Sequence, residues 1–187
     1  MATTPDATLP ITGKVFIACS LDGFIARENG DIDWLNRYPD TGDDYGYASF
    51  MDTVDGLVMG RASYEGVLRF EDWPYTKPVV VLSSSLDDTS VPPRLRGKVR
   101  ISNRTPRAIM QELAKEGWRA AYVDGGRLIQ SFLAERLIGE MTITQIPVLL
   151  GRGRRLFGVV EQDIELFLEE TRRYPAGFVQ SRYRVGT

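Results

Sequence analysis

The chain of 187 residues contains no histidine and only one cysteine, Cys19. Without an imidazole there is no Ser/His/Asp or Cys/His triad and no histidine acid–base catalysis, and nearly all zinc-site designs are excluded. A single cysteine forms no intramolecular disulfide, so the fold depends on an apolar core. We therefore expect no metal site, and any catalysis must use other side chains.

Long apolar runs and a strong net charge are also missing. No segment approaches the roughly 20 apolar residues of a membrane helix, and the N-terminus is neither basic nor apolar enough for a signal peptide. The net charge is −2, from 23 basic and 25 acidic side chains. Residues 89–111 are basic, but no aromatic residue lies between their arginines and lysine, which favours solvated surface over nucleic-acid binding. We expect a cytoplasmic protein with neither a membrane nor a nucleic-acid partner.

The length suits a single domain that buries about 70% of its unfolded surface. No repeat, proline-rich linker or low-complexity tract suggests a second domain. We predict a disordered N-terminus over residues 1–12 and a single domain over 13–187.

Short apolar runs alternate with helical patterns along most of the chain. Strands are predicted at 14–20, 56–59, 78–82, 99–102 and 120–123, and helices at 45–54, 62–68, 106–117 and 127–137. Thr105 before Pro106 is a typical helix start. Residues 22–39 show no sustained period and predict a loop, whereas 140–150, 165–173 and 178–185 predict strands. The fold class is therefore α/β: a mixed, mostly parallel sheet flanked by helices, with a C-terminal antiparallel β hairpin.

Small and polar residues follow three of these strands, at 60–63, 83–85 and 124–127. Ligands of open α/β sheets bind at the carboxyl edge, where helix N-termini present free N–H groups to anions. Each motif alone is typical of an ordinary turn or solvated loop. Together they suit a dinucleotide that carries a ribose phosphate, although the Rossmann glycine fingerprint and the Walker A loop are both absent.

Several segments resemble dihydrofolate reductases: ACSLDGFIA at 18–26, NGDIDW at 29–34, MGRASYE at 59–65, LSS at 82–84 and VDGG at 123–126. Other features are more similar to a sister branch, the C-terminal reductase domain of the bifunctional riboflavin-biosynthesis deaminase-reductase and its stand-alone relatives. These features are SLDG at 20–23, the acid before the paired glycines, and PVLLGRG at 147–153 with LF at 156–157. The resemblance covers nearly all of the chain after residue 13. The zinc site of the deaminase partner cannot be built here, because histidine is absent.

The resemblance implies a dihydrofolate reductase-like fold with NADPH as hydride donor. By position, Ala18 and Ile25 would hold the nicotinamide carboxamide through backbone groups. Gly60 would open the next cofactor helix. Arg61 with Ser83 or Ser84 would surround the 2′-phosphate, and Ser63 would lie near the pyrophosphate or the nicotinamide ribose. Asn103 or Arg104 would be additions to the 2′-phosphate site. The pyrophosphate would lie against the turn and helix start at Asp124, Gly125, Gly126, Arg127, Leu128 and Ile129, where a cis Gly125–Gly126 peptide is an open expectation.

The substrate side of the resemblance is weaker. Dihydrofolate reductases place a carboxylate shortly after the loop tryptophan. The candidates here are Asp33, which directly precedes Trp34, and Asp40, which follows it. Either could equally be a turn residue. The alternative is that no protein acid is needed, because hydride addition to a protonated imine can rely on positioning and water. The aromatic residues Phe24, Tyr45 and Tyr47 could form a platform or the core, as could Trp34, whereas Phe50 is expected in the core.

Taken with the resemblance, the sequence predicts an NADPH-dependent oxidoreductase that reduces a small heterocyclic or ribosylaminopyrimidine-like substrate. This activity would be similar to that of a 5-amino-6-(5-phosphoribosylamino)uracil reductase in riboflavin biosynthesis. The alternatives are a dihydrofolate or pterin reductase and a non-catalytic NADPH-binding protein. Phe167, Phe178, Val179 and Tyr183 lie on the predicted C-terminal strands, and they suggest a homodimer through this region.

Overall fold

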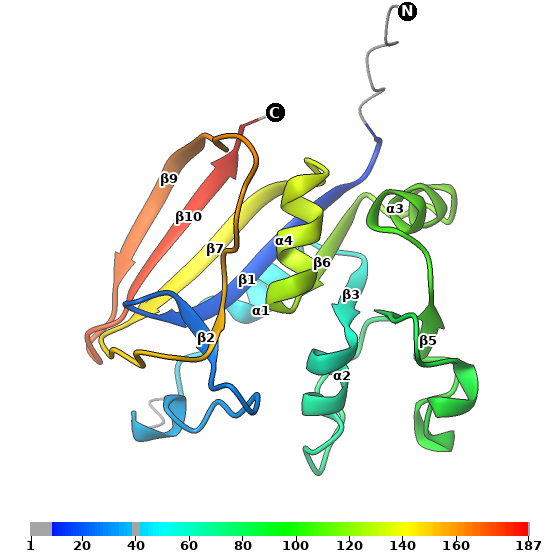
Figure 1. Cartoon of the computed structure of the whole chain (residues 1–187), viewed down its shortest axis with the longest axis horizontal. Coiled ribbons are helices and arrows are strands. Elements are labelled where there is room, and N and C mark those ends of the chain that lie inside the picture. The colour runs from blue at the N-terminus through cyan, green and yellow to red at the C-terminus, as the bar shows by residue number, and fades with distance from the viewer. Residues whose placement is uncertain (1–8, 39–41, 187) are drawn as a thin grey trace, which may run out of the picture.

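The computed structural model describes residues 9–38 and 42–186. Figure 1 shows how their strands and helices are arranged. The strands are β1 (Thr12–Ser20), β2 (Phe24–Ala26), β3 (Gly56–Gly60), β4 (Val79–Leu82), β5 (Val99–Ser102), β6 (Ala120–Asp124), β7 (Ile138–Ile146), β8 (Arg154–Arg155), β9 (Leu166–Arg173) and β10 (Val179–Val185). The α-helices are α1 (Tyr47–Met51), α2 (Arg61–Val67), α3 (Pro106–Lys115) and α4 (Gly126–Ala134), and short 3-10 helices lie at η1 (Leu35–Arg37), η2 (Asp88–Ser90) and η3 (Pro93–Leu95).

Eight strands form one sheet in the order β5-β4-β3-β6-β1-β7-β10-β9. The pairs from β5 to β7 are parallel, whereas β10 runs antiparallel to both β7 and β9. This arrangement confirms the predicted mixed, mostly parallel sheet with a C-terminal antiparallel hairpin. Because β4, β3 and β6 are neighbours, the three polar motifs that follow them lie at one edge of the sheet.

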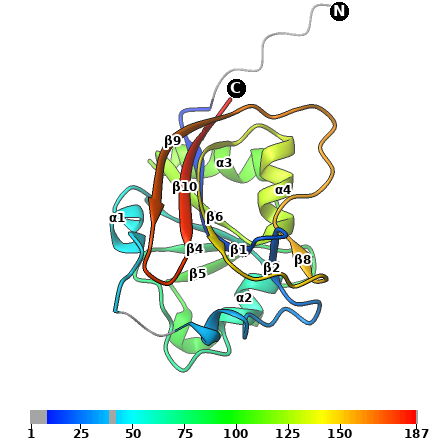
Figure 2. The ribbon, with the colours of Figure 1, turned by 90° about the vertical axis from the view of Figure 1, so that its left-hand side faces the viewer.

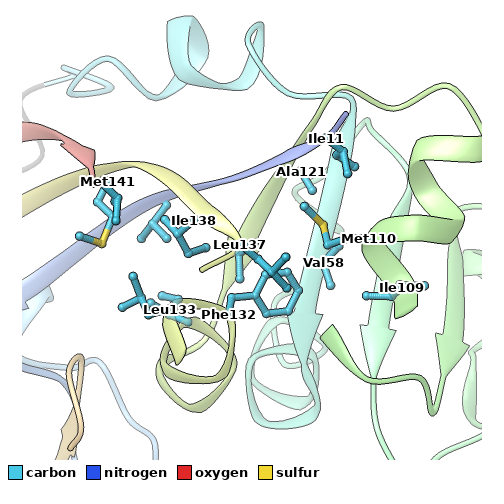
Figure 3. Packing of buried hydrophobic residues seen from close by; sticks show 14 of the residues in the cluster. Ile11, Val58, Ile109, Met110, Ala121, Phe132, Leu133, Leu137, Ile138 and Met141 are labelled. Atoms are coloured by element: carbon cyan, nitrogen blue, oxygen red, sulfur yellow. The ribbon is translucent and has the colours of Figure 1, made fainter. Parts of the chain in front are cut away.

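An apolar layer covers each face of the sheet, and α4 and α1 lie on opposite faces (Figures 1 and 2). Successive residues of a strand point to opposite faces, so Val58 joins the layer beneath α3 and α4 while Leu57 and Met59 join the layer beneath α1 and α2. The first layer is shown in Figure 3, where Phe132 and Leu133 of α4 lie with Ile138 and Met141 of β7. The two layers together fix the sheet on which the strand-end loops are carried.

Local sequence signals account for several helix boundaries. The Thr105 hydroxyl accepts a hydrogen bond from the Ala108 N–H at 3.4 Å, which confirms the expected start of α3. The helix predicted at 45–54 is shorter, because Gly46 before it has a φ of 83° and a turn follows Met51. The helix predicted at 127–137 begins at Gly126 and ends at Ala134, since Arg136 takes a φ of 53° that a helix does not allow.

Two further expectations require correction. Residues 1–8 lie outside the described residues, but Ile11 is 5% exposed in the core and Thr12 opens β1, so ordered chain begins before residue 13. The segment 22–39 is not a loop throughout its described part, because β2 pairs antiparallel with β8. The partner strand lies about 130 residues further along the chain, too far for local periodicity to indicate the pair.

Candidate functional site

The turns after β3 and β6 meet in direct contact. Gly125 has a φ of 104°, and a Cβ placed on it would lie 2.6 Å from the Ser63 hydroxyl oxygen on α2. Only glycine takes this conformation readily and leaves this space. The predicted residues Gly60, Ser63 and Gly125 therefore lie together, and α2 and α4 both begin at the same place.

The expected cis peptide at Gly125–Gly126 is wrong, because the described residues contain no cis peptide bond. The tight turn is achieved instead by the positive φ of Gly125. Gly125 provides no side chain to cap the nine-residue helix α4. The first N–H groups of that helix can therefore hydrogen-bond an anion, as the pyrophosphate of a dinucleotide would require.

Arg61 reaches from α2 to the serine loop after β4. Its Nη1 donates to the Ser85 hydroxyl at 3.3 Å, and the Ser85 and Ser83 hydroxyl oxygens are 3.4 Å apart. Glu65, one turn along α2, lies 3.7 Å from the Arg61 guanidinium. A guanidinium beside two hydroxyl groups suits a phosphate monoester. Sequence reasoning paired Arg61 with Ser83 or Ser84, whereas the direct contact is with Ser85.

The loop after β5 borders the serine loop. The Ser83 N–H donates to the Ser102 carbonyl at 2.9 Å, which brings Asn103 next to the serine loop. The Arg104 side chain forms an ion pair with Glu112 of α3. Asn103 therefore remains a candidate beside the phosphate site, whereas the Arg104 charge is already balanced within the protein.

The strand pair β2–β8 lies against the glycine turn. A Cβ placed on Gly126 would be 2.9 Å from Ile25 Cδ1 and 2.8 Å from the Arg155 carbonyl oxygen. The Arg155 guanidinium stacks over the Phe24 ring, 4.6 Å from its centroid. The predicted cofactor residues Ile25 and Gly126 are thus brought together. The position of Arg155 was not predicted, because no local pattern indicates that β8 pairs with β2.

Asp22 holds this strand pair in place. Its carboxylate accepts hydrogen bonds from the Ser20 hydroxyl at 2.6 Å and from the backbone N–H groups of Leu150 and Gly151 at 3.1 and 2.7 Å. These hydrogen bonds, the one from Ser20 above all, lower the pKa of Asp22 to about 2. The SLDG motif therefore fastens the segment before β8 to the turn after β1.

An aromatic cavity of about 400 Å³ lies beside Ala18 of β1. Its lining residues are Phe16, Ala18, Leu35, Asn36, Tyr38, Asp44, Tyr45, Tyr47, Thr144, Ile146 and Phe178. Tyr45 and Tyr47 thus line a hollow. Trp34 and Phe50 are buried in the core, with 0% and 7% exposure, and Phe24 packs under Arg155. The predicted nicotinamide position at Ala18 opens onto this cavity.

Asp124 lies at the end of β6, on the same side of the sheet as the cavity. Its carboxyl accepts hydrogen bonds from the Ser63 hydroxyl and the Gly125 N–H, yet burial outweighs both and raises its pKa. Burial also raises the pKa values of Tyr47 and Tyr75, and the charge of nearby Asp124 raises them further. Asp124 thus lies beside Gly125 of the glycine turn and close to Tyr47, which lines the aromatic cavity.

Asp33 has a different environment from Asp124. It is exposed and receives hydrogen bonds from Arg27 at 2.5 and 3.1 Å, which lower the pKa of its carboxyl. Asp33 is therefore ionised at neutral pH, which does not favour a role as proton donor. Asp40, the second predicted acid, lies outside the described residues.

Comparison with known proteins agrees with this architecture. The sequence profile of the RibD C-terminal domain matches residues 12–180, which run from β1 into β10. The chain belongs to the RibD C-terminal domain family. This RibD C-terminal domain is 36% identical over 163 residues to YwjB of Bacillus subtilis, an uncharacterised protein, and the alignment covers 86% of this chain and 90% of YwjB.

Solved structures place the same fold in related proteins. A candidate riboflavin biosynthesis protein from Shewanella sp. PV-4 matches this RibD C-terminal domain with a TM-score of 0.89 and 40% identity, over 95% of this chain and 100% of that one. A dihydrofolate reductase from Enterococcus faecalis, solved with NADP(H), matches with a TM-score of 0.65 and 15% identity over 94% and 97% of the two chains. The second likeness shows that the fold is dihydrofolate reductase-like.

The described residues of this RibD C-terminal domain include no helix long and apolar enough to cross a membrane.

Two residues of the site were not predicted from the sequence. Asp44 lines the cavity, and Arg155 lies beside the glycine turn. Both depend on contacts between distant segments.

Proposed function

We propose that the protein is an NADPH-dependent reductase that transfers hydride to a small heterocyclic substrate bound in the aromatic cavity. The observation that carries the proposal is the convergence of three strand-end loops at one edge of the sheet. Ser63 meets Gly125, and Arg61 meets Ser85. Membership of the RibD C-terminal domain family supports a reductase of the riboflavin-biosynthesis type.

The chemistry of these groups fits the proposed cofactor. The free N–H groups at the start of α4 would bind the pyrophosphate, and Ser63 would lie beside it. Arg61 with the serine loop would bind the 2′-phosphate, with Asn103 at its border. Arg127 and Leu128 would line the pyrophosphate from the first turn of α4. The expected role of Ile129 requires correction, because its side chain is 0% exposed in the core and its N–H donates to the Gly125 carbonyl at 2.8 Å. NADPH, when bound, would supply the hydride.

The nicotinamide would lie where the cofactor side meets the cavity. Backbone groups of Ala18 and Ile25 would hold its carboxamide, and Ala18 also lines the aromatic cavity. The cavity walls would keep water from the hydride path and fix the orientation of the substrate ring. Asp124 is better suited than Asp33 to handle a proton, because burial raises its pKa whereas the guanidinium of Arg27 lowers that of Asp33.

Thermal melting with NADPH and NADH tests this proposal. A ligand at 100 times its dissociation constant stabilises the folded state by about 2.7 kcal/mol. We expect a clear increase in melting temperature with NADPH and a smaller one with NADH at the same concentration. No increase with either nucleotide would contradict the proposed cofactor, and a preference for NADH would remove the phosphate-binding role of Arg61.

The homodimer remains a prediction, and the structure changes the residues that could form it. Phe178 is 6% exposed and packs within its own chain, whereas Phe167 and Leu168 of the edge strand β9 are 38% and 60% exposed. We infer that a dimer would use β9. Sizing should then give twice the chain mass of 21.0 kDa, and a particle of 21.0 kDa would contradict it.

A further inference from the structure

The aromatic cavity contains no group that would compensate the charge of a phosphate. Within the described residues its lining includes neither lysine nor arginine, and its only carboxylate is Asp44. The residues outside the description, 1–8, 39–41 and 187, include no lysine or arginine by sequence.

The basic residue next to the lining in sequence, Arg37, is exposed and is not one of the lining residues. Its charge adds to the lowering of the pKa of Asp33, after the hydrogen bond and the charge of Arg27. A phosphate that is moved out of water without a cation or several donors carries a large desolvation cost. On the cofactor side, by contrast, Arg61 and two serine hydroxyl groups lie together.

Asp44 is exposed and places a negative charge at the lining of the cavity. Its two carboxylate oxygens accept hydrogen bonds from the backbone N–H groups of Gly46 and Ala48 at 2.9 and 2.8 Å. These bonds hold the pKa of Asp44 below its usual value, so the carboxylate is negative at neutral pH. A fixed negative charge at the lining favours N–H donors or a cationic ring and opposes a phosphate.

The other walls suit a planar ring. The ring centroids of Tyr45 and Phe178 are 5.5 Å apart, and those of Phe16 and Tyr47 are 5.7 Å apart. Gln180 donates to the Thr144 hydroxyl oxygen at 2.9 Å, which directs the hydroxyl proton of Thr144 away from Gln180. The cavity thus combines aromatic faces, an O–H donor and a carboxylate acceptor, a pattern that matches an amino-substituted heterocycle.

We propose that the substrate of this cavity is a planar, uncharged or cationic heterocycle that carries no phosphate. The proposal rests on the proposed reductase function and narrows it. It departs from the phosphoribosyl substrate that the family resemblance implies. The only phosphates that the protein would bind are those of the cofactor.

The test compares a ring compound with its own phosphate ester, and it adds a dihydropterin as a second phosphate-free ring. 5-Amino-6-(ribosylamino)uracil, its 5′-phosphate and a dihydropterin are titrated by calorimetry into protein saturated with NADP⁺, which has no hydride to donate, so that binding is measured without turnover. We expect at least one phosphate-free compound to bind about tenfold more tightly than the phosphate. The proposal would be overturned if the 5′-phosphate bound as tightly as both phosphate-free compounds, or more tightly. It would also be overturned if none of the three compounds bound.

Two variants separate charge repulsion from general damage. Asp44→Asn removes the negative charge and keeps one oxygen that can accept from the backbone N–H of Gly46 or Ala48, and it should reduce the discrimination against the phosphate several-fold. Asp52→Asn makes the same charge change beyond the other end of α1, away from the cavity lining, and should leave the discrimination unchanged. Equal effects of the two variants would contradict the role of Asp44. NADPH melting is measured on the same samples, and its failure would count against the proposed function itself.

Discussion

The cofactor side of the site and the aromatic cavity lie next to each other but treat charge in opposite ways. On the cofactor side, Arg61, the serine loop and the bare start of α4 all present donors. In the cavity, most of the lining side chains are aromatic or aliphatic, and the single carboxylate among them is the exposed Asp44. Under the two proposals above, one edge of the sheet would bind a highly charged cofactor and would also select a substrate with no negative charge.

The largest expected effect comes from filling the space at Gly125. Gly125→Ala would place a Cβ 2.6 Å from the Ser63 hydroxyl at a φ of 104°. Strained backbone of this kind costs about 1–3 kcal/mol, and the clash would also move α2 from α4. We expect NADPH-induced stabilisation to be lost in thermal melting.

Gly97→Ala provides the matched control for Gly125→Ala. Gly97 has a φ of 79°, but a Cβ there would meet no heavy atom of the described residues within 4 Å, its chain neighbours aside. This variant should lower stability and keep the response to NADPH. If both variants kept that response, contact between the two turns would not matter for binding.

Changes at Arg61 should alter the affinity for NADPH and leave the affinity for NADH nearly unchanged. Loss of a hydrogen-bonded ionic contact costs about 1.5–3 kcal/mol, so Arg61→Ala should weaken NADPH binding roughly 10- to 100-fold with little change for NADH. Glu65→Gln removes the acid 3.7 Å from Arg61 and should strengthen NADPH binding slightly. Titration of both nucleotides checks this, and equal losses for NADPH and NADH in Arg61→Ala would be the contrary result.

Asp124→Asn tests the group between the two regions. Burial raises the pKa of Asp124 in the folded protein, so its contribution to stability is present below its unfolded pKa of about 3.8 and is lost as pH rises through the folded value. The asparagine variant avoids this loss. It should melt at a higher temperature than the unmodified chain at neutral pH, and the advantage should disappear in acid.

The control for Asp124→Asn is Asp163→Asn, at an exposed position. The melting temperature of this variant should stay close to that of the unmodified chain across the pH range. If Asp124→Asn showed the same flat profile, Asp124 would not be the buried acid described here.

The smallest effect should be local and lie at Asp22. Hydrogen bonds lower the pKa of Asp22 to about 2, so its contribution is present above pH 3.8 and is lost as pH falls toward 2. Asp22→Asn should accelerate hydrogen exchange at the Leu150 and Gly151 amides, with little change in melting temperature at neutral pH. Unchanged exchange at both amides would show that Asp22 does not fasten this segment.

Much of the fold and of the cofactor side could be predicted from local patterns. β5 has the bounds that were predicted for it, and Thr105 with Pro106 marks the start of α3. The alternation of strands and helices predicts parallel strands, so the motifs at Gly60, Ser83 and Asp124 were expected at one edge. These features depend on residues close together in the chain, which is why the sequence predicts them.

The cavity and the strand pair depend on distant contacts, and they could not be predicted. β8 is two residues long and carries no periodic signal, but it pairs with β2. In the sequence, Asp44 is one of several acids in a polar segment. It becomes part of a cavity only because β1, β7 and Phe178 lie beside it in the fold. Asp33 was assigned to proton handling because it precedes Trp34, and its partner Arg27 became evident only in the structure.

Hydrogen exchange of the backbone amides with and without NADPH tests the central claim most directly. The account predicts simultaneous protection of Ser63, of the serine loop at 83–85 and of the α4 start at 126–128, with weaker protection of the serine loop when NADH replaces NADPH. Protection confined to one of these loops, or found on another surface, would contradict the claim that they form a single cofactor site.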